Sequence, residues 1–260
     1  MAKSDSAMRQ AQHMKPRGRR WRVVAASVSA LLGVCLVVFG PSARAEGPAS
    51  PAALDPAWPK VLTVITDSVA LVVGNPLRIT LPGWRISVLG RPALMVNQAL
   101  PEFLKHKYVG PVVVVGLGYN SQFEKNHKNE ARWNGLWDYR AEQLLRSLKE
   151  RGAKKVVWLT LREPTPSVVT SRGQSQYEQY AWFFPLVNAR IHALAARHPE
   201  VAVADWARVS NVPGVTTDLI HLNRPGAKLM AEVIAQAVLG PPPLASPVQA
   251  ALSAESSHGS

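Results

Sequence analysis

Short apolar runs alternate with helical patterns between residues 59 and 239. Five runs are rich in strand-forming residues: 61–65, 84–89, 112–116, 155–161 and 201–205. Four of them are almost continuously hydrophobic, which is typical of strands buried on both faces. The pattern therefore predicts five strands of a parallel sheet.

Stretches with apolar residues three and four positions apart lie between these runs. They predict helices over roughly 68–81, 93–105, 137–151, 181–197 and 224–239. A repeated strand–helix alternation places helices on both faces of a parallel sheet, because each crossover connection must pass over one face. We therefore predict an α/β fold, a three-layer α/β/α sandwich with a five-stranded parallel sheet.

The segments on either side of this region have a different composition. Residues 46–58 are rich in Pro and Ala without periodicity and are predicted to be a linker. The tail, 240–260, has the composition of a disordered segment. Residues 59–239 are then one domain of ordinary size, preceded by a distinct N-terminal segment, 1–45.

The N-terminal segment has the layout of an export signal. Residues 1–22 carry seven Lys or Arg and one Asp, and residues 23–39 carry no charge at all. Ala43 and Ala45 then form an A-x-A site, as in a cleavable signal. Seventeen apolar residues also approach the length of a membrane span. The predicted location is extracytoplasmic, either anchored by residues 23–39 or secreted after cleavage near Ala45.

Charge and cysteine content narrow the possible partners. The formal net charge is +13, but much of the excess lies in residues 1–22, and no basic stripe follows, so no nucleic-acid partner is expected. The only cysteine, Cys35, lies in the apolar segment, so the exported domain has no disulfide. Without further cysteines or a paired-histidine motif, neither a metal nor another cofactor is expected.

Polar residues and one glycine follow the predicted strands at their carboxyl ends, where open parallel α/β sheets bind ligands. They are Asp67 and Ser68 after the first strand, Gly90 and Arg91 after the second, Asn120 after the third, Arg162 and Glu163 after the fourth, and Asp218 and His221 in a loop beyond the fifth. The sequence therefore predicts the functional site at this edge of the sheet.

A serine, a histidine and a carboxylate at one edge are the side chains of nucleophilic acyl transfer. The hydroxyl of Ser68 needs a base near neutral pH, and His221 titrates in the right range. Asp218, three residues earlier, would orient the imidazole. The amides of Ser68 and Gly90 and the side chain of Asn120 would donate to the oxyanion.

These residues resemble the motifs of the SGNH hydrolases, also called GDSL-type esterases, over residues 60–239. Thr66-Asp67-Ser68 resembles the first block, Gly118-Tyr119-Asn120 the third, and Asp218-Leu219-Ile220-His221 the fifth; Gly90 resembles the second-block glycine. The resemblance implies that Ser68 is the nucleophile and that Asp67 supports it rather than serving as the triad acid.

Thr66 departs from the family, which has glycine at this position. If the backbone there needs angles that only glycine adopts easily, Thr66 would displace the nucleophile. If the strand continues in extended form, threonine is favourable, and this is the alternative we expect.

The predicted function is an exported serine esterase that forms an acyl-serine intermediate on an ester substrate. Esterase, lipase or deacetylase activity and O-acyl transfer to an envelope polysaccharide or lipid are all compatible with the resemblance. The alternative is a catalytically weak or inactive surface protein that uses the fold for binding, a possibility raised by Thr66.

Two further features have two interpretations each. Arg162 either forms an ion pair with Glu163 or contacts an anionic group of the substrate. Seven aromatic residues either shape an acyl or sugar pocket or pack in the core. They are Trp133, Trp137, Tyr139, Tyr177, Tyr180, Trp182 and Phe183.

Overall fold

A computed structural model describes residues 54–105, 107–124, 130–166 and 174–240. Its five strands are β1 (Val61–Thr66), β2 (Arg85–Gly90), β3 (Val112–Gly116), β4 (Lys155–Leu159) and β5 (Val201–Ala204). They form one parallel sheet in the order β2-β1-β3-β4-β5. The predicted strands and their parallel arrangement are confirmed.

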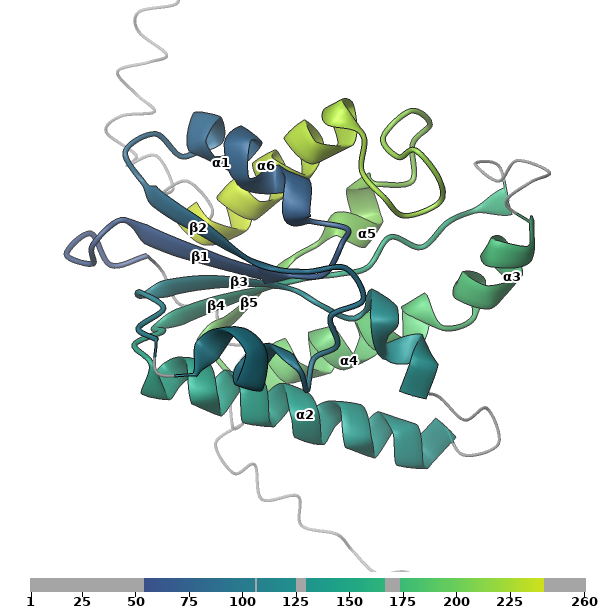
Figure 1. Cartoon of the computed structure of the whole chain (residues 1–260), viewed down its shortest axis with the longest axis horizontal. Coiled ribbons are helices and arrows are strands. Elements are labelled where there is room, and N and C mark those ends of the chain that lie inside the picture. The colour runs from purple at the N-terminus through teal and green to yellow at the C-terminus, as the bar shows by residue number, and fades with distance from the viewer. Residues whose placement is uncertain (1–53, 106, 125–129, 167–173, 241–260) are drawn as a thin grey trace, which may run out of the picture. The chain divides into compact units, whose positions relative to one another are not determined.

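Helices cover both faces of this sheet (Figure 1). They are η1 (Leu71–Val73), α1 (Gly74–Thr80), η2 (Leu100–Leu104), η3 (Tyr119–Glu124), α2 (Glu130–Glu150), α3 (Gln174–Ala181), α4 (Phe184–Arg197), α5 (Trp206–Val209) and α6 (Arg224–Leu239). α1 and α6 lie together on one face, and α2 and α4 lie on the other. The three-layer α/β/α sandwich is therefore confirmed.

The helix predictions were partly wrong. The predicted helix 68–81 is split into η1 and α1, and the predicted helix 137–151 begins earlier, at Glu130 of α2. Between residues 93 and 105 only Ala99 and the π-helical turn η2 are helical, and Ala93 has a positive φ of 59° that is incompatible with a helix. The predicted helix 181–197 is observed as α4, which begins three residues later at Phe184, and the separate helix α3 before it was not predicted. Pro185, in the first turn of α4, lacks the amide that would continue a helix from α3, so it favours a new start.

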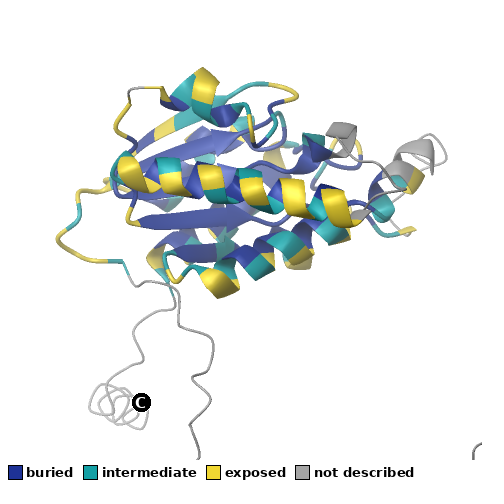
Figure 2. Ribbon diagram, turned by 90° about the horizontal axis from the view of Figure 1, so that it is seen from below, coloured by how far each residue is buried: buried dark blue, intermediate teal, exposed yellow. Residues whose placement is uncertain are grey.

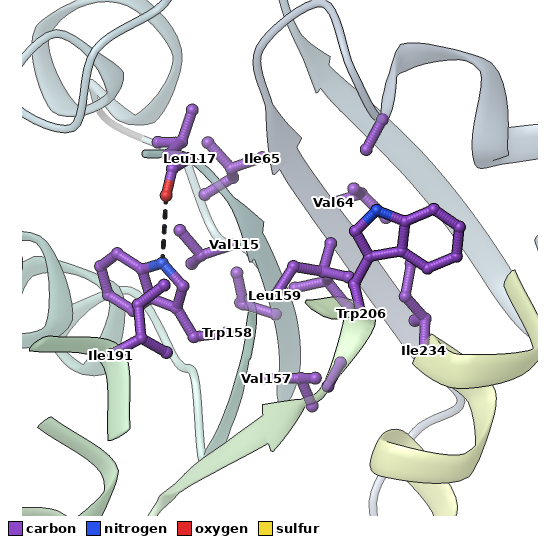
Figure 3. Close-up of a cluster of buried hydrophobic side chains, with 14 of the residues drawn as sticks. Val64, Ile65, Val115, Leu117, Val157, Trp158, Leu159, Ile191, Trp206 and Ile234 are labelled. Carbon is purple, nitrogen blue, oxygen red and sulfur yellow. Dashed lines mark hydrogen bonds between the residues drawn. The ribbon is translucent and has the colours of Figure 1, made fainter. Parts of the chain in front are cut away.

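The core lies on the two faces of the sheet, and the helices turn their exposed residues outward (Figure 2). Every residue of β3 and β4 is buried, as expected for central parallel strands. Figure 3 shows Trp158 beside Ile191 of α4 and Trp206 beside Ile234 of α6, and both tryptophans are fully buried. The indole of Trp158 donates a hydrogen bond of 3.2 Å to the Leu117 carbonyl, which follows β3.

The strand order places a topological switch between β1 and β3. The chain leaves β1 for β2 on one side, and later strands are added on the other side of β1. In doubly wound sheets of this order, the crevice outside the carboxyl ends at such a point binds ligands. The segments after β1 and β3 contain Ser68 and Asn120, so these residues lie at the expected place.

Several predictions fall on residues that the structure does not describe. The apolar segment 23–39, the A-x-A site, most of the linker and the tail beyond Gly240 all lie outside the described ranges. Within those ranges, no helix has the length and hydrophobicity needed to span a bilayer.

Candidate active site

Ser68 lies in the turn that joins β1 to η1, with its side chain half-buried. Its hydroxyl oxygen is 3.0 Å from Nε2 of His221, a residue 153 positions further along the chain. The strand ends at Thr66, and the turn presents Ser68 at the carboxyl edge of the sheet. Ser68 and His221 are thus brought into hydrogen-bond contact, as the sequence predicts.

The other nitrogen of this imidazole, Nδ1, is 2.7 Å from Oδ2 of Asp218. The second carboxylate oxygen accepts the backbone amides of Ile220 at 2.8 Å and His221 at 2.7 Å. Partial burial opposes ionisation of Asp218, but the hydrogen bonds from His221 and Ile220 outweigh it and lower the pKa of this carboxyl. With Asp218 ionised, Nδ1 carries the proton and Nε2 is available to accept from Ser68.

Asn120 lies beside Asp67. Its side-chain amide donates to Asp67 Oδ2 at 3.0 Å and makes a longer contact of 3.5 Å with the carbonyl of Leu94. Asp67 is fully buried, and its other oxygen accepts the amide of Val69 at 3.0 Å. Asp67 is therefore a supporting residue, as the resemblance implies, and its partner Asn120 was not foreseen from the sequence.

The environment of Asp67 makes its carboxyl unusually basic. Burial raises the pKa to about 7, although the hydrogen bonds from Val69 and Asn120 and the charge of His221 act in the opposite direction. Asp67 therefore titrates near neutral pH, within the group of side chains that surrounds Ser68.

Gly90 lies at the end of β2, in register with Thr66 of β1. A Cβ atom on residue 90 would lie 2.0 Å from the carbonyl oxygen of Thr66, so any side chain there would clash with the backbone of β1. Close strand packing is thus sufficient reason for glycine at this position. The donation of its amide to an oxyanion stays a prediction.

Thr66 continues β1 in extended form. Ala93 is the only non-glycine residue with positive φ in the described ranges, so Thr66 does not adopt the angles that favour glycine. Its buried hydroxyl lies 3.1 Å from the carbonyl oxygen of Asp67 and 3.2 Å from that of Gly116, and these two acceptors compete for its single proton. Threonine is therefore accommodated at this position without displacing the backbone of the neighbouring nucleophile.

Both predicted interpretations of Arg162 were wrong. The side chain is only 2% exposed, and its guanidinium group donates to the loop that precedes His221. Glu163 instead accepts a hydrogen bond of 2.6 Å from Asn188 of α4. The sequence did not reveal this arrangement, because the burial of Arg162 depends on a loop about 50 residues further along the chain.

The seven aromatic residues are divided between the core and the surface. Trp133, Trp137, Tyr180 and Phe183 are buried, Tyr177 and Trp182 are partly buried, and Tyr139 is 59% exposed. The rings of Trp133 and Phe183 pack edge to face with their centroids 5.1 Å apart. Core packing therefore accounts for four of them.

No group of three or more potential metal-binding side chains occurs within the described part of the chain. The site instead contains the Ser68 hydroxyl, the His221 imidazole and the Asp218 carboxylate, hydrogen-bonded in series. The side-chain amide of Asn120 is hydrogen-bonded to Asp67, next to Ser68. Such a set can transfer a proton from serine to histidine while the serine oxygen attacks an electrophilic carbon.

By sequence, no protein family matches the chain, and no similar curated protein was found. By structure, it is similar to a GDSL-like lipase from Bacteroides thetaiotaomicron, with a TM-score of 0.53 and 17% identity over 69% of this chain and 87% of that one. An acetyl xylan esterase aligns with a TM-score of 0.52 and 13% identity over 68% of this chain and 99% of that one.

The C-terminal catalytic domain of peptidoglycan O-acetyltransferase A from Streptococcus pneumoniae aligns with a TM-score of 0.48 and 24% identity, over 70% of this chain and 93% of that one. At such identities, the fold is what the aligned proteins have in common. The alignment with the GDSL-like lipase, at a TM-score of 0.53, shows that the chain has the fold of the GDSL-like, or SGNH, hydrolases, and the resemblance carried by its motifs is confirmed at the level of the fold.

Proposed function

We propose that the protein is a serine ester hydrolase or acyltransferase that works through an acyl-serine intermediate. The observation that carries this proposal is the series of contacts from Ser68 through His221 to Asp218, with distances of 3.0 and 2.7 Å. Three side chains from opposite ends of the domain meet in the order that a serine nucleophile needs. The esterase and lipase names of proteins with this fold support the same class of reaction.

In the first half-reaction, Ser68 Oγ attacks the ester carbonyl carbon while Nε2 of His221 takes the hydroxyl proton. The carbonyl oxygen becomes an oxyanion, to which the amides of Ser68 and Gly90 and the side chain of Asn120 donate. The bond to the alcohol oxygen then breaks, and the leaving alkoxide takes the proton from His221. The products are a free alcohol and an acyl group bound to Ser68.

In the second half-reaction, His221 removes a proton from an acceptor, which attacks the acyl carbon. The bond between this carbon and Ser68 Oγ then breaks, and Ser68 takes the proton back from His221. Water as acceptor gives hydrolysis, and a sugar hydroxyl gives acyl transfer. Asp218 stays ionised and stabilises the imidazolium, because hydrogen bonds from His221 and Ile220 lower the pKa of this carboxyl.

We further propose that this reaction takes place outside the cytoplasm, on an ester of an envelope polysaccharide or lipid. The support is the basic, apolar and A-x-A order of residues 1–45. Cell fractionation of the full chain tests it: activity confined to the cytosolic fraction would rule out export. The mass of the exported form separates cleavage near Ala45 from anchoring by residues 23–39.

The alternative of an inactive binding protein rested on Thr66. Thr66 has an extended conformation and therefore requires no rearrangement of the turn that holds Ser68, so it no longer supports this alternative. Nothing else in the described part of the chain favours the binding protein.

The test is labelling with a fluorophosphonate probe, followed by turnover of acetyl, butyryl and long-chain p-nitrophenyl esters. We expect the wild type to be labelled and Ser68→Ala to be unlabelled with an unchanged fold. Ser87→Ala is a matched control, since Ser87 is an exposed serine on β2. A folded wild type that reacts neither with the probe nor with any of the esters would overturn the proposal. Repeating the assay with sugar acceptors distinguishes transfer from hydrolysis.

A further inference from the structure

Two buried cations lie at opposite ends of the same strand. Lys155 begins β4 and is 1% exposed, and Arg162 follows its carboxyl end and is 2% exposed. Charged side chains are rarely buried unless the protein supplies hydrogen-bond partners. Lys155 donates to the carbonyl of Val238, in the last turn of α6. Its partner lies at the amino edge of the sheet, remote from Ser68.

The hydrogen-bond partners of the Arg162 guanidinium group lie in one segment, residues 210–219, which leads into His221. The guanidinium donates to the carbonyls of Ser210 at 2.9 Å and Leu219 at 2.8 Å, and to the hydroxyl of Thr216 at 2.6 Å. A longer contact of 3.4 Å reaches the carbonyl of Val212. This segment contains no helix or strand. It is held by an isolated bridge between Thr216 and Leu222, by backbone hydrogen bonds such as that from the Thr217 amide to the His221 carbonyl, and by the contacts with Arg162.

Two of these contacts continue directly to the candidate triad. The hydroxyl of Thr216 accepts from Arg162 and donates to the backbone carbonyl of Asp218. Leu219, whose carbonyl also accepts from Arg162, is the residue after Asp218. The loop is thus fixed on both sides of the carboxylate that holds His221.

Arg162 also contacts the opposite side of the site. Its backbone amide donates a hydrogen bond of 2.7 Å to the hydroxyl of Tyr119, the residue before Asn120. Tyr119 is buried, so this contact is shielded from water. Arg162 therefore connects the segment that carries Asn120 with the segment that carries Asp218 and His221.

We propose that Arg162 is a positioning residue that holds the Asp218–His221 loop in register with Ser68. This role rests on the proposed acyl-transfer function, since it acts through the triad. Arginine suits it because the planar guanidinium offers five donors in a fixed fork, which can reach several carbonyls at once. A lysine offers three donors from a single point and cannot span the same set.

The experiment compares Arg162→Lys and Arg162→Met with Lys155→Met, in the full chain. We expect both Arg162 variants to lose about 10²-fold in kcat with little change in KM, because displacement of a catalytic group by about 1 Å has an effect of this size. Lys155→Met also removes a buried cation, but it should keep wild-type kcat whatever its thermal midpoint. Circular dichroism verifies the fold of each variant.

A spectroscopic signature provides a readout independent of turnover. The proton between His221 Nδ1 and Asp218 should give a far-downfield proton resonance, identified by its loss in Asp218→Asn. We expect Arg162→Met to lose or shift this resonance and Lys155→Met to keep it. If the Arg162 variants do not fold, Thr216→Val serves instead. It removes the hydroxyl that links Arg162 to the Asp218 carbonyl but keeps the buried charge, so it should lower kcat and leave KM unchanged.

The possible outcomes separate this inference from the proposed function. A wild type that reacts with no probe or ester overturns the function itself. A reactive wild type whose folded Arg162 and Thr216 variants keep wild-type kcat and the downfield resonance overturns only the positioning role. Equal losses of kcat in Arg162→Met and Lys155→Met would also overturn it, because they would show a general response to losing a buried cation.

Discussion

The side-chain amide of Asn120 donates a hydrogen bond of 3.0 Å to the buried carboxyl group of Asp67. These residues belong to two different motifs of the sequence, one after β1 and one after β3. The contact fixes the amide at the edge of the sheet where Ser68 is presented. It leaves a second N–H of Asn120, whose nearest described acceptor is the Leu94 carbonyl at 3.5 Å.

The first prediction concerns stability and pH at Asp67. Its pKa is about 7 in the folded protein and 3.8 in the unfolded chain, so between these values the folded state holds a proton that the unfolded state has lost. The free energy of unfolding should therefore decrease as pH rises from about 4 to about 7, with a slope of up to about 1.4 kcal/mol per pH unit from this group.

Asp67→Asn cannot titrate and isolates this contribution. We expect the difference in free energy of unfolding, wild type minus Asp67→Asn, to fall across that pH range and to level off on either side. The lowered pKa values of Glu142, Glu200 and Asp218 give stability that is lost at low pH, but both proteins share it, so it cancels. Denaturant titrations at a series of pH values measure the difference. Parallel curves for the two proteins would show that Asp67 is ionised throughout.

The second prediction concerns Asn120 as an oxyanion donor. Loss of one such donor acts on the transition state, so Asn120→Ala and Asn120→Gly should lower kcat by about 10²–10³ with little change in KM. The matched control is Asn97→Ala, an exposed asparagine in the loop after β2. Steady-state kinetics and thermal midpoints are measured together. A variant that melts early but turns over normally when folded would restrict Asn120 to a structural role.

The third prediction concerns Asp218. Asp218→Asn keeps the size of the side chain but no longer favours the His221 tautomer with its proton on Nδ1, so kcat should fall by about 10⁴. Asp55→Asn is the control, because Asp55 accepts the amide two residues on, as Asp218 does, far from the triad in sequence. If Asp218→Asn retains most of the wild-type kcat, another group must orient His221.

Much of this site follows from local sequence. The strands are short runs with clear ends, and the residues after them meet at one edge because the sheet is parallel. The final helix was predicted within its observed bounds, 224–239. Its start is marked locally, since Asn223 caps it by accepting the amide of Gly226 at 3.0 Å and Pro225 lies in its first turn.

The remainder depends on contacts between distant segments. Arg162 resembles a surface residue in sequence, but it is buried, and its guanidinium group finds its hydrogen-bond partners in the loop from Ser210 to Leu219. The pairing of Asp67 with Asn120 likewise joins residues 53 positions apart. No periodicity or spacing in one sequence encodes which side chain of one loop meets which side chain of another.

The fourth prediction concerns Thr66, where this chain departs from the family. Thr66 is in register with Gly116 of β3, and a Cβ atom on residue 116 would lie 3.0 Å from the Thr66 hydroxyl. Gly116 therefore leaves the space that the threonine side chain fills. Glycine at both positions would leave this space empty and would add a flexible residue to the end of β1.

We accordingly expect Thr66→Gly to lower the free energy of unfolding by about 1–3 kcal/mol without raising kcat. Thr66→Val keeps the β-branched shape and loses only the hydrogen bonding of the hydroxyl to the carbonyls of Asp67 and Gly116, so it should be less destabilised than Thr66→Gly. Denaturant unfolding and ester turnover are measured on both variants. If folded Thr66→Gly were about tenfold faster than the wild type, threonine would be displacing Ser68. The inactive binding protein would then have support again, because the natural residue would be the one that impairs catalysis.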